Sequence, residues 1–359
     1  MRLLDRYLAR HVLWYTLLVM SVLVTLVSLF VFIDQQRDVG VGHYGMLEAL
    51  FVTVLLVPQQ AFQLLPVAAL IGALVGLGNL ARGSELIVIR AAGVSVLRVA
   101  LAAAGAGVLL LAVGAVVGEV LAPPLEAYAH EIKTFGKYNN FSFAGRAGIW
   151  VKDGSQIVSI QQQSADNVYG GLYIYRVAVD ADGRQRLAGL ARADRAEIVA
   201  GRDWRLWNYA DSALGADGVT VRRVPTLTGD TGISPEFLAI AVVDPGSLPI
   251  RGLWRYVQHL RVNGLESRAW EVALWSRISR SLSTVLLCML AVAFVFGPLR
   301  SAGAGSRTVI GVIVGVVYFL INRTLENSGD VYDLNPLLVA WAPAALLAVV
   351  TAVAVARVR

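Results

Sequence analysis

The chain has 359 residues, of which 57% are hydrophobic and only 16% are charged. Soluble globular proteins carry about 45–50% apolar and about 25% charged residues, so this composition excludes a purely soluble protein. Residues 126–271 hold 17 basic and 16 acidic side chains, whereas the rest of the chain holds 14 and 9. The net charge of +6 comes mostly from arginines that flank apolar segments, which favours membrane orientation over nucleic-acid binding.

Six apolar segments are long enough to cross a bilayer, which takes about 20 residues. They cover residues 12–33, 62–81, 99–118, 281–299, 308–322 and 334–356, and the fourth helix is predicted to begin near Trp270. Residues 49–81 carry no charge, but Pro58, Pro66 and three glutamines interrupt the first half of this stretch. We therefore interpret that half as an interfacial or broken segment.

The arginines predict the orientation of these spans. Short loops that fall on one side of a six-span chain carry ten arginines, and those on the other side carry Arg37 and Arg323. Because Lys and Arg accumulate on the cytoplasmic side, we expect both termini to be cytoplasmic and residues 122–269 to lie outside. The first apolar segment is too long for a cleaved signal peptide and precedes no cleavage site.

The apolar pattern changes to a period of two from about residue 146. Residues 172–177 alternate in this way, and turn signals such as residues 152–155 and 180–183 separate the runs. Short strands joined by tight turns predict an all-β domain, either a sandwich, a jelly roll or an open barrel. The fold class is thus an α-helical membrane protein with six transmembrane helices and an inserted β domain, divided into residues 1–121, 122–269 and 270–359.

Several kinds of chemistry have no motif here. The three lysines, Lys133, Lys137 and Lys152, do not stand in a phosphate-binding glycine loop, so the chain is not expected to be an ATPase. The four histidines show no metal-ligand spacing, and there is no nucleophile elbow. The single cysteine, Cys288, excludes an intrachain disulfide. We expect no enzyme activity, metal or cofactor.

The loop after the second span predicts a short helix at about residues 84–93. Ser84 is suited to cap it, Glu85 falls in its first turn, and Gly93 is a natural stop. Such a helix either docks into a groove on a soluble partner or lies on the inner leaflet. Small residues in the preceding span, Gly72, Gly76 and Gly78, favour close helix packing within the chain over packing against a partner.

Short motifs along the whole chain resemble the LptF/LptG family of lipopolysaccharide export permeases. They cover residues 4–7, 84–93, 150–154, 274–277 and 296–301, and the first and last resemble the LptG branch. The resemblance implies one of two different permeases of an ABC transporter. That transporter extracts lipopolysaccharide from the bacterial inner membrane and passes it to a periplasmic bridge towards the outer membrane.

The same resemblance implies partners. An LptB-like ATPase is expected to hydrolyse ATP and to contact the coupling residues Ser84, Glu85, Leu86, Ile89 and Gly93. An LptF-like second permease, together with LptC and LptA, is expected to continue a groove formed by a periplasmic, jelly-roll-like β domain.

Candidate lipid-binding residues follow from the same family. The arginine fork suits phosphate, and Arg277 and Arg280 fall on one helical face. Arg37 follows the first span, where similar proteins often carry two adjacent basic residues and this chain has Asp38. Membrane anchoring, or pairing of Arg323 with Glu326, is the alternative interpretation of these charges. The full set is Asp34, Arg37, Lys133, Lys137, Arg277, Arg280, Tyr318 and Arg323.

A different class of function also fits the layout. A non-transporting membrane scaffold would recruit soluble partners through its β domain and would have no need of Glu85. A secondary transporter is less consistent, because the centres of most spans carry no acid.

Overall fold

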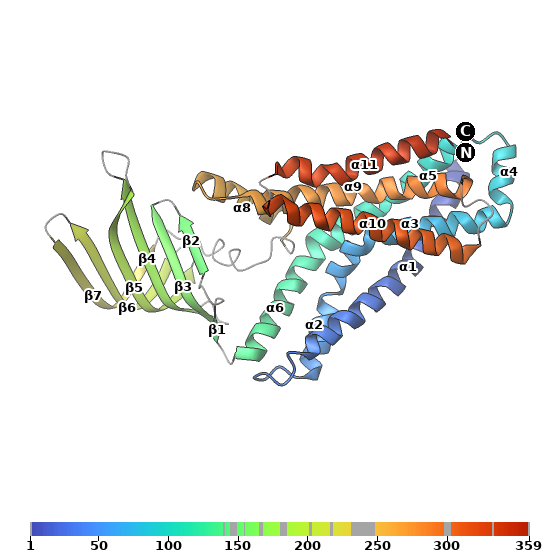
Figure 1. Ribbon diagram of the computed structural model, residues 1–359. Helices are drawn as coiled ribbons and strands as arrows, with labels where there is room; N and C mark the ends of the chain where they lie inside the picture. Colours follow the sequence, from blue (N-terminus) through green and yellow to red (C-terminus); the bar gives the residue numbers. More distant parts are fainter. Residues whose placement is uncertain are drawn as a thin grey trace.

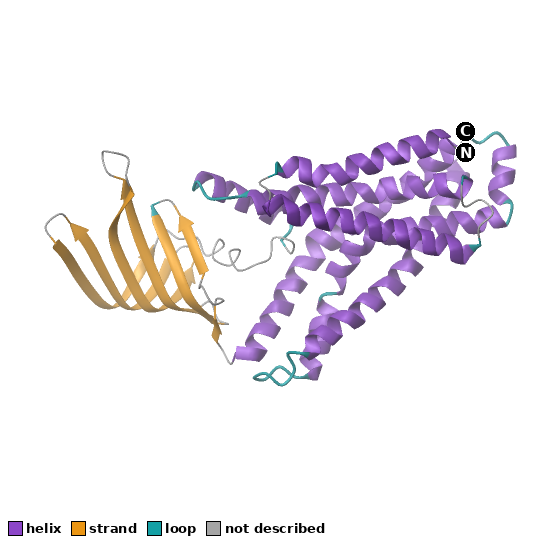
Figure 2. Ribbon diagram, in the orientation of Figure 1, coloured by secondary structure: helices purple, strands orange, loops and turns teal. Residues whose placement is uncertain are grey.

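The computed structural model describes residues 2–138, 141–143, 149–153, 155–164, 168–179, 185–200, 203–215, 218–230, 248–297, 303–331 and 334–357. A long body of helices carries a curved sheet beyond one of its ends (Figure 1, Figure 2). The short helix α4 and both chain termini lie at the opposite end (Figure 1). The expected architecture, six apolar helices with an inserted β domain, is confirmed.

The helical body contains six helices long and apolar enough to span a membrane within the described residues. Its first half consists of α1 (Arg2–Gln36), α2 (Met46–Leu55), α3 (Val57–Arg82), α4 (Glu85–Ala91), α5 (Val96–Val116), the π-helical turn η1 (Val117–Leu121) and α6 (Ala122–Tyr138). Its second half consists of α8 (Ile250–Val262), α9 (Arg268–Phe296), α10 (Ala304–Val331) and α11 (Pro336–Arg357).

Two helix boundaries show how the apolar segments begin and end in the structure. The expected break before the second span is present, because α2 ends at Leu55 and α3 begins at Val57 with a proline in its first turn. Proline is tolerated there since the first helical N–H groups have no intrahelical acceptor. The helix that contains the third span continues past residue 118, through η1 into α6, where Glu126, Glu131 and Lys133 add charges.

Helix α3 is the centre of the helical body. In its most apolar stretch 72% of the residues are buried, against 6% for α1 and 22% for α10. Gly72 and Gly76 face α1, and a Cβ atom at Gly72 would overlap the backbone of Thr16. Gly78 faces Arg307 of α10, whose guanidinium donates a hydrogen bond to the Gly78 carbonyl oxygen. The prediction that these glycines serve packing within the chain is confirmed.

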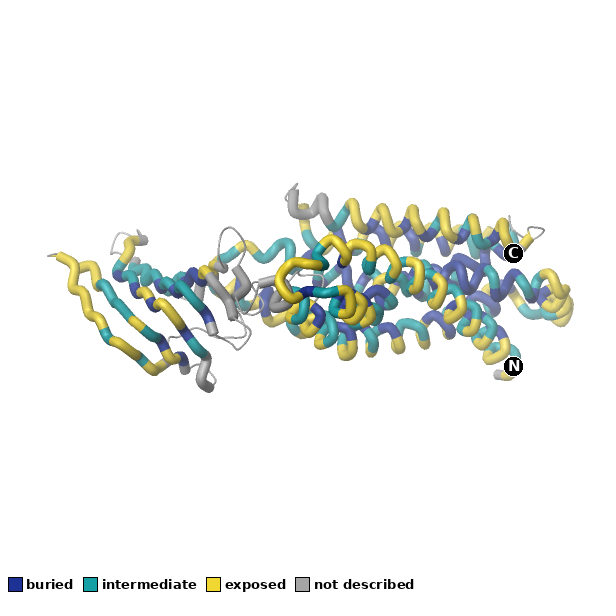
Figure 3. Tube along the Cα trace, turned by 90° about the horizontal axis from the view of Figure 1, so that it is seen from below, coloured by how far each residue is buried: buried dark blue, intermediate teal, exposed yellow. Residues whose placement is uncertain are grey.

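Large apolar side chains on α1 and α10 are exposed, and Figure 3 shows exposed residues along the outside of the helical body. The large exposed side chains on these two helices include Trp14, Leu17, Val22, Val309, Ile313 and Leu320. In water such a surface would be costly, whereas lipid tails or another apolar helix cover it without penalty. Both helices therefore leave a face for the bilayer or for a second membrane subunit.

The inserted domain is one curved antiparallel sheet over the described residues (Figure 2). Its strands are β1 (Phe141–Phe143), β2 (Ile149–Asp153), β3 (Gln156–Ser164), β4 (Val168–Val179), β5 (Gln185–Ala200), β6 (Asp203–Gly215) and β7 (Gly218–Asp230). Neighbours run in the order β1-β3-β4-β5-β6-β7, and β2 also pairs with β3.

One face of the sheet carries the apolar core of the domain. The register places Ile174 of β4 opposite Val158 of β3 and Ala191 of β5, so the three side chains share this face. Trp204 and Leu206 of β6 extend the core, and all five residues are buried. The period of two along the sequence therefore marks a real two-sided sheet.

The close contact at Gly72 predicts a sharp difference between two glycines. Gly72→Ala is expected to destabilise the protein by about 1–3 kcal/mol, because the added methyl group forces α1 away from α3. Gly105→Ala is the matched control, since open space surrounds Gly105 on α5. It should change stability by less than about 1 kcal/mol. Thermal unfolding of both variants in detergent measures this, and equal melting temperatures would contradict the packing argument.

Candidate functional site

Helix α4 is a short helix between α3 and α5, at one end of the helical bundle. Leu86 is buried in the same apolar core as α1, α3, α5 and α9, and Ile89 packs against that core. Ile87 and Val88 are 52% and 66% exposed. The helix thus has one anchored face and one free apolar face, an arrangement that suits docking into a groove.

The two ends of α4 form in different ways. Gly93 ends the helix as expected, with a φ angle of +86° and its N–H donating to the carbonyl oxygen of Arg90 at 2.9 Å. Ser84 occupies the N-cap position, but the predicted capping by its side chain is wrong. Its backbone is left-handed, with φ of 59°, so only its carbonyl oxygen serves the helix, accepting from Val88 N–H.

Glu85 and Arg90 connect α4 to two membrane helices. The hydroxyl of Tyr7 on α1 donates a hydrogen bond of 2.7 Å to the Glu85 carboxylate. The guanidinium of Arg90 lies 5.7 Å from the centre of the Phe296 ring, at the end of α9. These two contacts join α4 to α1 and to the end of α9.

The far end of the body holds two ion pairs of different character. Arg37 lies 3.5 Å from Asp34 one turn earlier, and the two side chains are 80% and 63% exposed. Lys133 of α6 pairs with Asp38 at 3.0 Å and joins the helix α6 to the turn after α1. Lys137 belongs to α6, but its side chain lies outside the described residues.

Arg277 lies in a polar cluster buried between α3, η1 and α9. Its side chain is 6% exposed, and its Nε and Nη2 atoms donate to the Glu119 carboxylate and to the Gly118 carbonyl oxygen at 2.5 and 2.6 Å. Its guanidinium also lies 4.8 Å from the centre of the Phe62 ring. These contacts hold the Arg277 side chain inside the helical body.

Arg280, one turn further along α9, forms an ion pair with Glu326 of α10. The alternative pairing of Arg323 with Glu326 is wrong: Arg323 is exposed and has no ion-pair partner among the described residues. The reason is geometric, since α9 and α10 turn Arg280 and Glu326 towards each other and Arg323 away. Tyr318, on α10, is 9% exposed and contributes to the core of the bundle.

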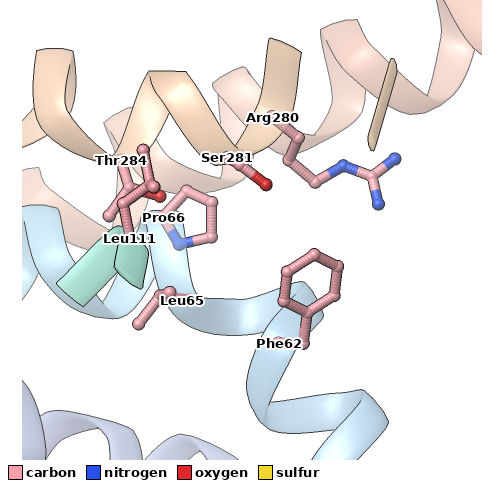
Figure 4. Close-up of a pocket in the computed structure, with 7 residues that line it drawn as sticks. All are labelled: Phe62, Leu65, Pro66, Leu111, Arg280, Ser281 and Thr284. Carbon is pink, nitrogen blue, oxygen red and sulfur yellow. The ribbon is translucent and has the colours of Figure 1, made fainter. Parts of the chain in front are cut away.

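A small apolar cavity lies beside Arg280. Figure 4 shows Phe62, Leu65 and Pro66 of α3 with Leu111 of α5 and Arg280, Ser281 and Thr284 of α9 around it. Its volume is only about 10 Å³, the room of about one water molecule, so it is a packing gap beside Arg280 and not a site for an acyl chain.

The β domain contains a larger cavity of about 300 Å³ along the apolar face of the sheet. Ile174, Ala191, Leu206 and Leu227 supply its apolar lining, and an ion pair between Arg176 and Asp211 lies at its margin. Burial raises the pKa of Tyr209 in the same lining, and the charge of Asp211 adds to that rise. The cavity thus has an apolar floor and a polar margin, to which Gln156, Arg176 and Thr228 contribute.

The whole chain matches one protein family. Residues 6–357 match the model described as lipopolysaccharide export system permease LptF/LptG. The chain belongs to the LptF/LptG family. It is 32% identical to the lipopolysaccharide export system permease protein LptG of Escherichia coli (strain K12), covering 95% of this chain and 94% of that protein. It is 30% identical to LptG of Haemophilus influenzae, covering 96% of each.

Two residues make contacts at the site that the sequence interpretation did not foresee. The predicted third span stops at residue 118, one position before Glu119, which lies within the helical run and pairs with Arg277. A lone acid inside a long apolar segment was the available signal, since such a group needs a buried partner. Tyr7 belongs to the motif at residues 4–7, but nothing in the sequence indicates its contact with Glu85, 78 residues away.

The pairing of Glu326 predicts unequal effects on α10. Glu326→Gln should destabilise the protein by about 1–3 kcal/mol, because Arg280 is left half-buried without its carboxylate. Arg323→Gln, three residues away and exposed, should stay within about 0.5 kcal/mol of the natural protein. Thermal unfolding followed by tryptophan fluorescence compares the two. A larger loss for Arg323→Gln would restore the Arg323–Glu326 pairing.

Proposed function

We propose that this chain is the LptG-type permease subunit of an ABC exporter that extracts lipopolysaccharide from the inner membrane. The observation that carries the proposal is α4, whose anchored Leu86 and exposed Ile87 and Val88 form a docking helix in a member of this permease family. The coupling residues Ser84, Glu85, Leu86, Ile89 and Gly93 would contact an LptB-like ATPase, which would hydrolyse ATP. This chain would transmit the resulting movement.

The proposal includes an orientation. The sequence has ten arginines in the helix ends, termini and connections of the α4 side, which support a cytoplasmic position for α4 and both termini, and therefore a periplasmic position for the sheet. Residues 1–121 would form the first three spans, residues 122–269 the periplasmic part, and residues 270–359 the last three spans. The exposed faces of α1 and α10 would contact an LptF-like second permease around a shared lipid cavity.

The lipid would pass from basic residues to an apolar groove. Arg37, Arg280 and Arg323 would approach phosphate groups, and Lys133 and Lys137 would add positive charge nearby. Asp34, Arg277 and Tyr318 would support the outer half of the cavity through their contacts within the chain. The cavity on the apolar face of the sheet would then receive acyl chains. Strand β7 pairs on one side only among the described strands, so it supports β-augmentation with LptF, LptC or LptA.

Charge reversal on α4 tests the coupling role. Glu85→Arg is expected to reduce co-purification of the ATPase by about tenfold or more. An ATPase surface that accommodates the Glu85 carboxylate would repel a positive charge at this position, and such repulsion at an interface costs several kcal/mol. Glu266→Arg is the matched control, an exposed acid in the turn between α8 and α9 at the far end. It should retain the ATPase.

The measurement is affinity purification from native membranes in mild detergent, with quantification of the bound proteins. Two results would favour the non-transporting scaffold. The natural chain could recover only periplasmic proteins, or the Glu85→Arg variant could recover as much ATPase as the natural chain.

Photo-crosslinking tests the lipid path. A photoreactive residue in place of Leu227, which lines the sheet cavity, should crosslink lipopolysaccharide only when ATP is supplied. The same residue in place of Val221, which is 53% exposed and does not line that cavity, should crosslink several times less. Equal crosslinking at both positions, with or without ATP, would contradict transport along this face.

A further inference from the structure

The β domain is attached to the helical body by two chain segments, and both meet at Glu119. One segment is α6, which leaves η1 and leads to β1. The other returns from the sheet and begins the helix α8 at Ile250. The Ile250 N–H donates to Glu119 Oε2 at 2.6 Å, across 131 positions of sequence. The carboxylate also lies at the positive end of the α8 dipole, which favours its charge.

The π-helical turn is what presents Glu119 to its partners. Its N–H to carbonyl pattern is widened, with the Ala122 N–H bonded to the Val117 carbonyl oxygen. The Gly118 carbonyl oxygen accepts a hydrogen bond from Arg277 in addition to the Glu119 contact. π-Turns are rare in helices and are frequent at functional positions. This turn is therefore a candidate functional feature of the helix.

Helix α9 links this cluster to the docking helix. Arg277 binds Glu119 near one end of α9, and Phe296 at its other end lies under Arg90 of α4. At 1.5 Å per residue the two contacts are about 28 Å apart along one continuous helix. A displacement of α4 can therefore reach the attachment of the β domain through a single rigid element.

We infer that Glu119 is a positioning residue that couples movement of the membrane helices to the placement of the β domain. It acts through α9 by its ion pair with Arg277 and through α8 by its hydrogen bond with Ile250. The inference rests on the proposed function and adds to it the step at which lipid leaves the membrane cavity for the sheet.

The test compares lipid delivery with ATP use in the assembled complex in proteoliposomes. Delivery is read as lipopolysaccharide crosslinked at position 227 of the sheet, and ATP hydrolysis is measured on the same samples. Glu119→Gln should lower the lipid delivered per ATP by about fivefold or more, the lower end of ordinary coupling effects. Glu119→Asp, which keeps the carboxylate, should recover part of the ratio.

A matched control exists on the same pair of helices. Glu271 of α9 accepts from Arg261 of α8 but does not contact the third span, so Glu271→Gln should leave the ratio unchanged. If Glu119→Gln fails to assemble, Arg277→Lys replaces it, because lysine keeps the charge and loses the two-pronged contact.

Two results would overturn the inference. One is an unchanged ratio, including the case in which delivery and ATP hydrolysis fall in proportion, as expected for a simple brace. The other is an equal loss of the ratio in Glu271→Gln. A natural complex that hydrolyses no ATP contradicts the proposed function itself, and the coupling role of Glu119 then falls with it.

Discussion

The structure depends on the cost of an unpartnered charge away from water. A buried ion loses several kcal/mol of hydration, so each one must meet an opposite charge or a dipole that compensates it. Arg277 meets Glu119, Arg280 meets Glu326, and Arg307 meets the carbonyl oxygen of Gly78. Each contact joins different helices, so the same requirement that restricts charges also determines which helices lie side by side.

The helical body and the sheet are stabilised in different ways. Between membrane helices the hydrophobic effect supplies little, and close approach at small residues such as Gly72 and Gly107 allows dense packing. The sheet buries Trp204, Leu206 and their neighbours on one face in the ordinary manner of a soluble domain. One chain therefore combines a body that tolerates an apolar surface with a domain that hides its apolar residues.

Features that depend on local periodicity were predictable from the sequence. The six spans follow from uninterrupted apolar runs, the β domain from its period of two, and the role of Gly72 from small-residue spacing. Contacts set by distant parts of the chain were not predictable. Glu119 and Arg277 are 158 positions apart, and nothing near Glu326 indicates that Arg280, rather than Arg323, lies beside it. The left-handed turn at Ser84 also escaped prediction, because serine there is equally typical of an ordinary cap.

The hydrogen bond between Glu119 and Ile250 has a consequence for how the chain is organised. The two ends of the inserted segment lie within hydrogen-bonding distance of each other. The insertion therefore leaves the helical bundle and returns to it at the same place. A segment with neighbouring ends can be exchanged, lengthened or shortened without moving the helices on which it is mounted. Evolution can therefore vary the outer domain and the membrane body independently, provided that the junction itself is preserved.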